Sequence, residues 1–214
     1  MSGIERGRLI TLEGVEGAGK STNLAYLERL LSAAGRPPLL TREPGGTELG
    51  EAVRDLLLGH RHAGMGSDSE LLLMFAARAE NLVQRIRPAL TSGRWVLCDR
   101  FTDASFAYQG GGRGIDPVRI RVLEQWVHAD LQPDLTLLLD LPVNQGLERA
   151  GRRSQPDRFE AEEQAFFERV RRAYLERARA EPERIRIIDA GQELAAVQSQ
   201  LRSELDAFLQ SKSR

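Results

Sequence analysis

The chain carries, at residues 9–22, the stretch LITLEGVEGAGKST, an apolar run followed by a glycine-rich loop. Residues 9–12 have the length and apolar character of a buried strand, and a helical period begins near Lys20. The residues between them satisfy the pattern G-x-x-x-x-G-K-[S/T], the P-loop that cradles phosphates. A strand, this loop and a helix in that order predict a parallel α/β sheet with a phosphate site after its first strand.

Short apolar runs alternate with longer segments of helical period along the rest of the chain, which predicts helices on both faces of a parallel sheet. The expected strands are residues 9–12, 39–41, 95–98, 135–139 and 185–188. Gly35 can close the first helix, and Asp116 followed by Pro117 predicts the start of another. Since no repeat or linker interrupts the pattern, residues 1–214 are predicted to form one doubly wound α/β domain around a five-stranded parallel sheet.

The composition limits the classes of partner and compartment. The 214 residues include 30 basic and 31 acidic side chains, for a net charge of -1, so charge gives no reason to expect nucleic acid or a membrane as a partner. No apolar stretch is long enough to span a bilayer, and the N-terminus lacks a signal-peptide core. Cys98, the single cysteine, cannot form an internal disulfide, which suits a reducing compartment. We therefore expect a cytoplasmic protein.

In this chain a lysine within a motif is stronger evidence for a functional site than an arginine. Of the 30 basic residues only Lys20 and Lys212 are lysines, so neighbouring arginines are expected by chance, whereas a lysine in the P-loop is not. Lys20 is expected to reach the β- and γ-phosphates of ATP, and Ser21 to offer its hydroxyl to Mg²⁺.

A second metal-side group should end a neighbouring strand. Asp99, Asp140 and Asp189 each follow an expected strand, and each could equally be a turn or helix-cap residue. Asp99 is preferred because Arg100 follows it, and a carboxylate for the metal beside a guanidinium for an anion suits phosphoryl transfer. The predicted metal residues are therefore Ser21 and Asp99.

Further segments make the chain resemble the bacterial thymidylate kinases (dTMP kinases), a family of P-loop nucleoside monophosphate kinases. They are residues 13–22, TREPGGT at 41–47, FAAR at 75–78, DRF at 99–101 and AYQGGGRG at 107–114, in order over nearly the whole chain. The resemblance implies transfer of the γ-phosphoryl group of ATP to dTMP, giving dTDP and ADP, with Mg²⁺, in a homodimer. A kinase for another pyrimidine monophosphate or a deoxynucleoside, or a non-catalytic nucleotide switch, remains an alternative.

The acceptor site is implied by the resemblance residue by residue. A phosphate monoester is largely dianionic at neutral pH, so its kinase needs positive charge rather than a general base. The resemblance assigns that charge to Arg54 and Arg100, and the edge of the base to Arg78, Ser105 and Gln109. The amide of Gln109 can donate and accept at once, which suits an imide. Without the resemblance, Arg54 would be a solvated helix residue, and Ser105 and Gln109 ordinary polar loop residues.

Other parts of the acceptor site are also implied by the resemblance. Tyr108 would lie at the ribose 2′ position, and Glu16 and Glu43, with Pro44 in the same turn, near the sugar and the metal. The family usually has a stacking Phe four residues before the arginine of the FAAR segment, where this chain has Met74. Phe75 is one position later and on a helix would point elsewhere, so Met74 and Phe75 are both candidates for the stacking residue.

A short lid is expected at about residues 147–160. Residues 15–18 of the P-loop contain no arginine, so the lid would supply the remaining charge. By resemblance Arg153 or Arg158 would act on the transferred phosphoryl group and Arg149 would pack near adenine; a solvated charge run is the alternative. The residues predicted to act in catalysis are Lys20, Asp99, Arg100, Arg153 and Arg158. Those predicted to bind ATP are Gly14, Val15, Glu16, Gly17, Ala18, Gly19, Lys20, Ser21, Thr22 and Arg149. Trp95 and Trp126 are predicted to be core residues.

Overall fold

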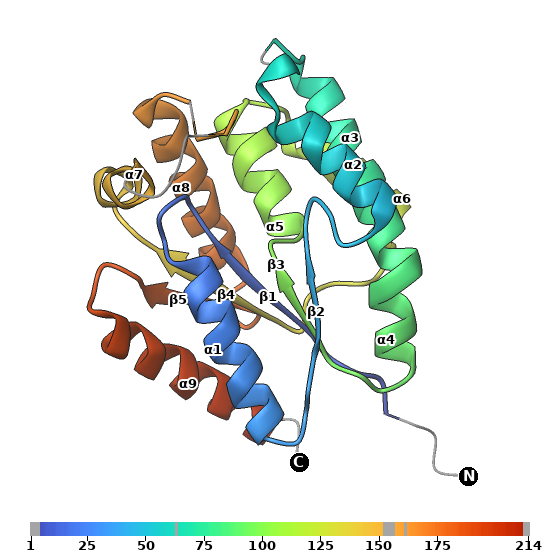
Figure 1. The fold of residues 1–214 in the computed structure, drawn as a ribbon, viewed down its shortest axis with the longest axis vertical. Coiled ribbons are helices and arrows are strands. Elements are labelled where there is room, and N and C mark those ends of the chain that lie inside the picture. The colour runs from blue at the N-terminus through green and yellow to red at the C-terminus, as the bar shows by residue number, and fades with distance from the viewer. Residues whose placement is uncertain (1–4, 63, 152–156, 161, 212–214) are drawn as a thin grey trace.

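A five-stranded parallel sheet forms the centre of the molecule in the computed structural model, which describes residues 5–62, 64–151, 157–160 and 162–211. The spatial order is β2-β3-β1-β4-β5, as Figure 1 shows, so β1 lies in the middle. The strands are β1 (Leu9–Gly14), β2 (Leu39–Arg42), β3 (Val96–Asp99), β4 (Leu135–Asp140) and β5 (Ile185–Asp189). All five predicted strands are therefore confirmed. Four are one or two residues longer at the carboxyl end than expected, and β3 begins and ends one residue later.

Helices cover both faces of this sheet. They are α1 (Lys20–Ala33), α2 (Glu48–Leu58), α3 (Ser67–Asn81), α4 (Arg87–Thr91), α5 (Thr102–Ser105), α6 (Pro117–His128), α7 (Val143–Gly151), α8 (Gln164–Ala180) and α9 (Leu194–Ser211). Side chains of α1 and α9 pack on one face with Ile10 and Leu12 of β1. The other face is covered by α8 and by the segments around α4 and α5, with Leu9 of β1 turned toward it. This alternation of inward residues along β1 is what a strand buried on both faces requires.

The connections agree with the predicted start and stop signals. The side chain of Asp116 accepts a hydrogen bond from the N–H of Val118, and α6 begins at Pro117. Gly35, after α1, has a φ of 72°, a conformation that favours glycine. Helix α3 passes through a π-helical turn, Leu82–Ile86, directly into α4. A second π-helical segment, Phe106–Gly112, continues α5 and carries Tyr108 and Gln109.

The two tryptophans have different environments. Trp95 is buried, as predicted, but the prediction for Trp126 is wrong: its side chain is 81% exposed. Helix α6 has apolar residues on two faces, and Val118, Val122 and Trp126, spaced four apart, form the outward one. Within the ranges described above, no helix is long and apolar enough to cross a membrane.

Candidate functional site

The P-loop connects the carboxyl end of β1 to the first turn of α1, where α7 packs directly against it. Gly17 has a φ of 74°, and a Cβ added to it would overlap the carbonyl oxygen of Gly146 in α7. Only glycine allows this approach, so the two backbones lie against each other. The loop leads directly into α1, which begins with Lys20 and Ser21. An N–H-rich loop at a helix N-terminus is an anion site.

Lys20 places its ammonium inside this loop. Its Nζ donates to the carbonyl oxygens of Gly14, at 3.0 Å, and Val15, at 3.2 Å. Burial, with the positive charge of Arg100 nearby, lowers the pKa of Lys20 to about 8. The positive charge of Lys20 is thus only partly balanced by neighbouring groups. A bound polyphosphate would supply the remaining negative charge.

Ser21 and Asp99 face a common space beside the P-loop, where they line one cavity together with Thr41. Asp99 ends β3, in register with Leu12 of β1, and its Oδ1 is buried without a hydrogen-bond partner among the described residues. Such an acceptor fits a water bound to Mg²⁺, an ion that keeps several waters and takes few protein ligands. In keeping with this, no cluster of three or more acidic, histidine or cysteine side chains suited to a metal occurs in the described residues.

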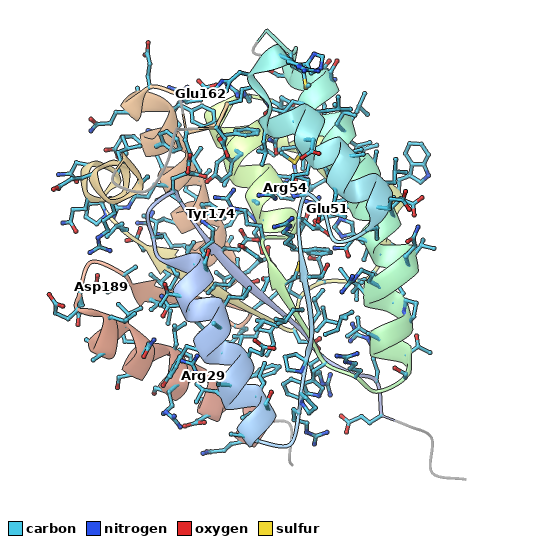
Figure 2. All side chains as sticks on the ribbon, viewed as in Figure 1. Arg29, Glu51, Arg54, Glu162, Tyr174 and Asp189 are labelled. Atoms are coloured by element: carbon cyan, nitrogen blue, oxygen red, sulfur yellow. The ribbon has the colours of Figure 1, made fainter. Side chains whose placement is uncertain are left out.

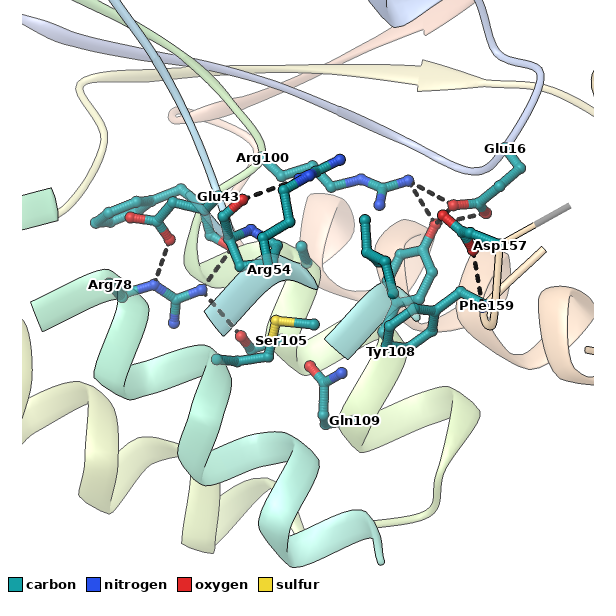
Figure 3. A pocket seen from close by; sticks show the side chains of 15 residues that line it. Glu16, Glu43, Arg54, Arg78, Arg100, Ser105, Tyr108, Gln109, Asp157 and Phe159 are labelled. Atoms are coloured by element: carbon teal, nitrogen blue, oxygen red, sulfur yellow. Dashed lines mark hydrogen bonds and ion pairs between the residues drawn. The ribbon is translucent and has the colours of Figure 1, made fainter. Parts of the chain in front are cut away.

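Arg100 joins the P-loop to the neighbouring cavity. Its φ of 66° lies in the left-handed region, which is rare for a non-glycine residue and occurs at functional sites. The side chain donates from Nη2 to Oε1 of Glu16 at 2.7 Å and to the hydroxyl of Tyr108 at 2.8 Å (Figure 3). Burial alone would raise the pKa of Glu16, but Arg100 and Lys20 lower it below its usual value, so Glu16 is an anion here.

Glu13, one residue before the P-loop, supports the turn that carries Arg100. Its Oε1 accepts from the N–H of Phe101 and its Oε2 from the hydroxyl of Tyr174 on α8, both at 2.7 Å. Burial, with the charge of Asp103 nearby, raises the pKa of Glu13 to about 8.

Figure 2 shows Tyr174 and Arg54 over the centre of the molecule, whereas Asp189, the end of β5, lies near its edge.

Arg78 organises the other end of the cavity. Its Nε lies 2.6 Å from Oε2 of Glu43, and its Nη2 donates to Oγ of Ser105 at 3.0 Å (Figure 3). Its Nη1 is buried and has no partner within the described part of the chain. Burial raises the pKa of Glu43, against the opposing effect of Arg78. A guanidinium held on two sides with one nitrogen left over can donate to a buried ligand atom.

The cavity brings together most of the predicted acceptor residues. Those that line it are Glu16, Glu43, Pro44, Arg54, Met74, Arg78, Arg100, Ser105, Tyr108 and Gln109. Arg54, on α2, also donates from Nη1 to the carbonyl oxygen of Pro44 at 2.9 Å. Three guanidinium groups, of Arg54, Arg78 and Arg100, therefore share one cavity with a set of buried polar side chains.

Phe75 lies outside this cavity. It is buried in a cluster with Leu71 and Ile120, and its ring stacks on His128 at a centroid distance of 6.0 Å. Successive residues of a helix point in different directions, and Met74 is the one that faces the cavity. Phe75 is thus a core residue that supports Arg78, whose Cζ lies 4.5 Å from the centre of its ring.

The lid arginines are placed differently from one another. Arg149, on α7, donates to the carbonyl oxygen of Ala190 at 3.0 Å and so connects the lid to the end of β5. Arg158 does not face the P-loop: its Nε donates to the carbonyl oxygen of Leu57 at 2.6 Å, and its Nη2 lies 2.8 Å from Glu70. The expectation that Arg158 reaches the transferred group is therefore not met in this arrangement. Arg153 lies outside the described residues.

Five cavity residues were missed by sequence reasoning, and so was Glu70 behind the cavity. The lining also includes Leu58, Phe101, Ala104, Asp157 and Phe159. Two of them had a sequence signal, because Phe101 lies in the DRF segment and Asp157 precedes Arg158 in the expected lid. Glu70 had none, since its partners come from segments about 40 to 90 residues further along the chain.

The comparisons with known proteins agree with one another. The family described as thymidylate kinase matches residues 12–201. A thymidylate kinase of Pseudomonas syringae pv. syringae (strain B728a) is 60% identical over 204 residues, covering 95% of this chain and 97% of that protein. One of Alcanivorax borkumensis is 55% identical over 195 residues, covering 91% and 94%. The crystal structure of thymidylate kinase from Ehrlichia chaffeensis superposes with a TM-score of 0.76 at 35% identity, covering 94% of this chain and 99% of that one.

Proposed function

The chain belongs to the thymidylate kinase family, and we propose that it holds dTMP in the cavity between Arg78 and Arg100 and ATP over the P-loop. It is a kinase that transfers the γ-phosphoryl group of ATP to dTMP, giving dTDP and ADP. In-line transfer requires an acceptor oxygen and the γ-phosphorus to meet, so the two nucleotide sites must open onto one shared space.

The observation that carries the site assignment is the position of Arg100. Its guanidinium contacts Glu16 of the P-loop and at the same time lines the acceptor cavity. Two polyanions must approach each other for the transfer, and a cation between them offsets their repulsion. Arg54, which lines the same cavity from α2, would hold the same acceptor phosphate, so the phosphate would be fixed with its attacking oxygen toward the P-loop.

Charge on the donor side would come from the P-loop. Lys20 would contact phosphate oxygens in place of the carbonyl oxygens of Gly14 and Val15. Because its pKa is lowered, its protonated form would be stabilised by the negative charge of the phosphates. Arg149 would lie at adenine, since its contact with Ala190 places it beside the loop after β5. For the transferred group we propose Arg153, because Arg158 is already engaged with Leu57 and Glu70. No proton acceptor is required, since the acceptor phosphate is already largely dianionic.

We propose Mg²⁺ as the cofactor. Ser21 would bind it through its hydroxyl and Asp99 through a bridging water, the role that suits its unpartnered Oδ1. When bound, Mg²⁺ neutralises part of the phosphate charge.

The base would be read at the closed end of the cavity. Nη1 of Arg78 is available for a carbonyl oxygen, and Gln109 and Ser105 provide further polar groups, while Met74 would pack on the ring. Tyr108, bonded to both oxygens of Glu16 at 2.9 and 2.7 Å, would occupy the space next to the sugar that a ribose 2′-hydroxyl needs.

A homodimer is proposed on the basis of an apolar surface on α3 and α6. Leu72 and Trp126 are exposed there, and they line a shallow groove together with Phe75, Ala76, Ala79, Leu123 and Val127. Apolar patches of this kind on a globular protein mark contact surfaces. A second copy is the occupant we favour, because the resemblance implies a dimer. The cytoplasm is the compartment proposed, in line with an unpaired cysteine.

The assignment is tested by coupled ADP release with ATP and Mg²⁺, offering dTMP, dUMP, dCMP, dGMP and thymidine separately. Turnover should be fastest with dTMP and negligible with thymidine, which lacks the phosphate that Arg54 and Arg100 would hold. Arg54→Ala should raise KM for dTMP, while Arg119→Ala, at an exposed pair with Asp68, should leave it unchanged. An unaltered KM in Arg54→Ala would contradict the proposed phosphate position.

A further inference from the structure

Glu70 is a buried carboxylate on which side chains from two separate segments, around Gln109–Arg113 and at Arg158, converge, although it does not line the substrate cavity. It lies in the first turn of α3 and is 0% exposed. Its Oε1 accepts a hydrogen bond from Nε2 of Gln109 at 3.0 Å. Its Oε2 lies 3.1 Å from Nη2 of Arg113 and 2.8 Å from Nη2 of Arg158. A buried carboxylate is stable only where hydrogen bonds and ion pairs replace the lost water, and these three partners provide them.

The contact with Gln109 fixes the direction of that amide. An ionised carboxylate only accepts hydrogen bonds, so the amino group of Gln109, and not its carbonyl, must face Glu70. The carbonyl oxygen is then left to the cavity that Gln109 lines. Figure 3 shows this orientation, with the side-chain oxygen of Gln109 on the side of Ser105.

We propose that Glu70 is a specificity-determining residue that acts through Gln109. By holding the amide in one orientation it makes this wall of the cavity a hydrogen-bond acceptor, which selects a base that carries N–H at ring position 3. This role of Glu70 rests on the proposed function of the cavity. It would explain a preference for thymine and uracil over cytosine.

The chemistry of the bases makes the orientation decisive. Thymine and uracil present an N–H donor at position 3 next to a carbonyl oxygen at position 4, whereas cytosine presents an acceptor nitrogen and a donor amine. The unpartnered Nη1 of Arg78 is a hydrogen-bond donor, and the carbonyl oxygen of the oriented Gln109 is an acceptor. This donor–acceptor pair complements the imide and opposes cytosine at both positions. A freely rotating amide would oppose it only at Arg78.

Two arginines hold Glu70 in place. Arg113 is held in turn by Glu162, whose Oε1 lies 2.5 Å from its Nη1. Arg158 is held by the carbonyl oxygen of Leu57. Because each arginine is anchored elsewhere, the carboxylate cannot rotate away from Gln109 without losing an ion pair. The ion pairs with two anchored arginines therefore favour one position of the carboxylate.

The test compares dTMP, dUMP and dCMP in Glu70→Gln, with Asp68→Asn as the matched control. Asp68 lies in the same first turn of α3 and also pairs with an arginine, Arg119, but it is exposed. In Glu70→Gln the new amide can either donate or accept a hydrogen bond, so the side-chain amide of Gln109 can adopt both orientations. The ratio of kcat/KM for dCMP to that for dTMP should rise at least about tenfold. The ratio for dUMP to dTMP should stay constant, since both are imides, and Asp68→Asn should change neither.

A double-mutant cycle with Gln109→Leu separates the possible outcomes. If Glu70 acts through Gln109, Glu70→Gln will change the dCMP ratio in the wild type and not in the Gln109→Leu background. A raised ratio in Gln109→Leu with no change in Glu70→Gln would overturn the role of Glu70 alone. If the dCMP ratio of Gln109→Leu equals that of the wild type, the proposed role of the cavity in reading the base is contradicted. Equal losses for all three nucleotides in Glu70→Gln would show a structural role and overturn the inference.

Glu70→Asp covers the case in which Glu70→Gln does not fold. It keeps the charge for Arg113 and Arg158 but withdraws the oxygens from Gln109 by one methylene group, so the dCMP ratio should rise in the same direction by a smaller factor. An unchanged ratio in folded Glu70→Asp would count against the inference. Failure of both variants to fold would assign Glu70 to stability and overturn it.

Discussion

Nη2 of Arg100 lies 2.7 Å from Oε1 of Glu16, so the acceptor-side arginine and the P-loop share one ion pair. The hydroxyl of Tyr108 bonds to both partners, and the backbone of Arg100 has a positive φ that aims the side chain between them. The consequence is that contacts within the protein hold Arg100 in position. Preorganised charge of this kind needs little reorganisation during the reaction.

Replacement of Arg100 by lysine should therefore fail to preserve activity. Lysine keeps the charge but lacks the planar fork that contacts Glu16 and Tyr108 while leaving nitrogens for a phosphate. We expect kcat/KM for dTMP to fall about a hundredfold, as measured by coupled ADP release. Arg119→Lys, at an exposed ion pair, is the control and should retain wild-type kinetics. Activity within about twofold of wild type in Arg100→Lys would mean that charge alone suffices.

ATP affinity should depend on the titration of Lys20. Burial and Arg100 lower the pKa of Lys20 to about 8, and bound phosphates would raise it again. Binding ATP should then take up a proton near pH 8, and the affinity should fall as the pH rises above 8, by at most about tenfold per pH unit. Calorimetry without acceptor, in two buffers of different ionisation enthalpy, measures this uptake. Lys20→Arg, which stays protonated, should lack it, and a proton uptake of zero in the wild type would refute the assignment.

Glu13 should make the protein less stable as the pH rises. Its pKa is about 8 in the folded protein and near 4.5 when unfolded, so between these values the folded state holds a proton that the unfolded state has lost. The free energy of unfolding should therefore fall from about pH 5 to pH 8, by at most about 1.4 kcal/mol per pH unit from this group.

Glu13→Gln isolates that effect, because the amide resembles the protonated acid and can keep the contacts with Phe101 and Tyr174. Urea denaturation at pH 5.5 and 7.5 should show a smaller loss of stability in Glu13→Gln than in the wild type. Glu183→Gln, at a side chain that is almost fully exposed, is the control. Parallel pH dependences in all three proteins would show that Glu13 is charged in the folded state.

The proposed dimer should depend on Trp126 and Leu72. A charged residue in the centre of an apolar interface is desolvated without a partner, which costs several kcal/mol. Trp126→Glu and Leu72→Glu should therefore shift the protein toward the monomer in sedimentation equilibrium. Leu194→Glu changes an equally exposed leucine on α9, away from this surface, and should leave the mass unchanged. A monomeric wild type, or a dimer insensitive to both changes, would remove α3 and α6 as the interface.

The five strands and the P-loop were predictable because they depend on local patterns. Five apolar runs of strand length separated by helical periods leave few arrangements, and the motif at residues 14–21 is fixed by spacing alone. The bounds differ by a residue or two where the strands run on into the functional loops, as β1 does to Gly14.

Contacts between distant segments were not predictable in the same way. Met74 and Phe75 are neighbours in sequence, and only the packing of α3 decides which faces the cavity. Trp126 was predicted to be a core residue, but α6 is apolar on two faces, one of which remains exposed in the single chain. Arg158 lies in the expected lid, yet its partners, Leu57 and Glu70, could not be inferred from spacing.

The burial of Cys98 has a practical consequence for solution spectroscopy. Its side chain is fully buried in β3, and burial raises the pKa of its thiol well above the ordinary value, so reagents that require a thiolate should leave it untouched. The natural sequence is therefore already a cysteine-silent background. A single surface cysteine introduced on α2 or α7 would be the sole site for a fluorophore or spin label, and nucleotide binding could be followed without first removing a native thiol.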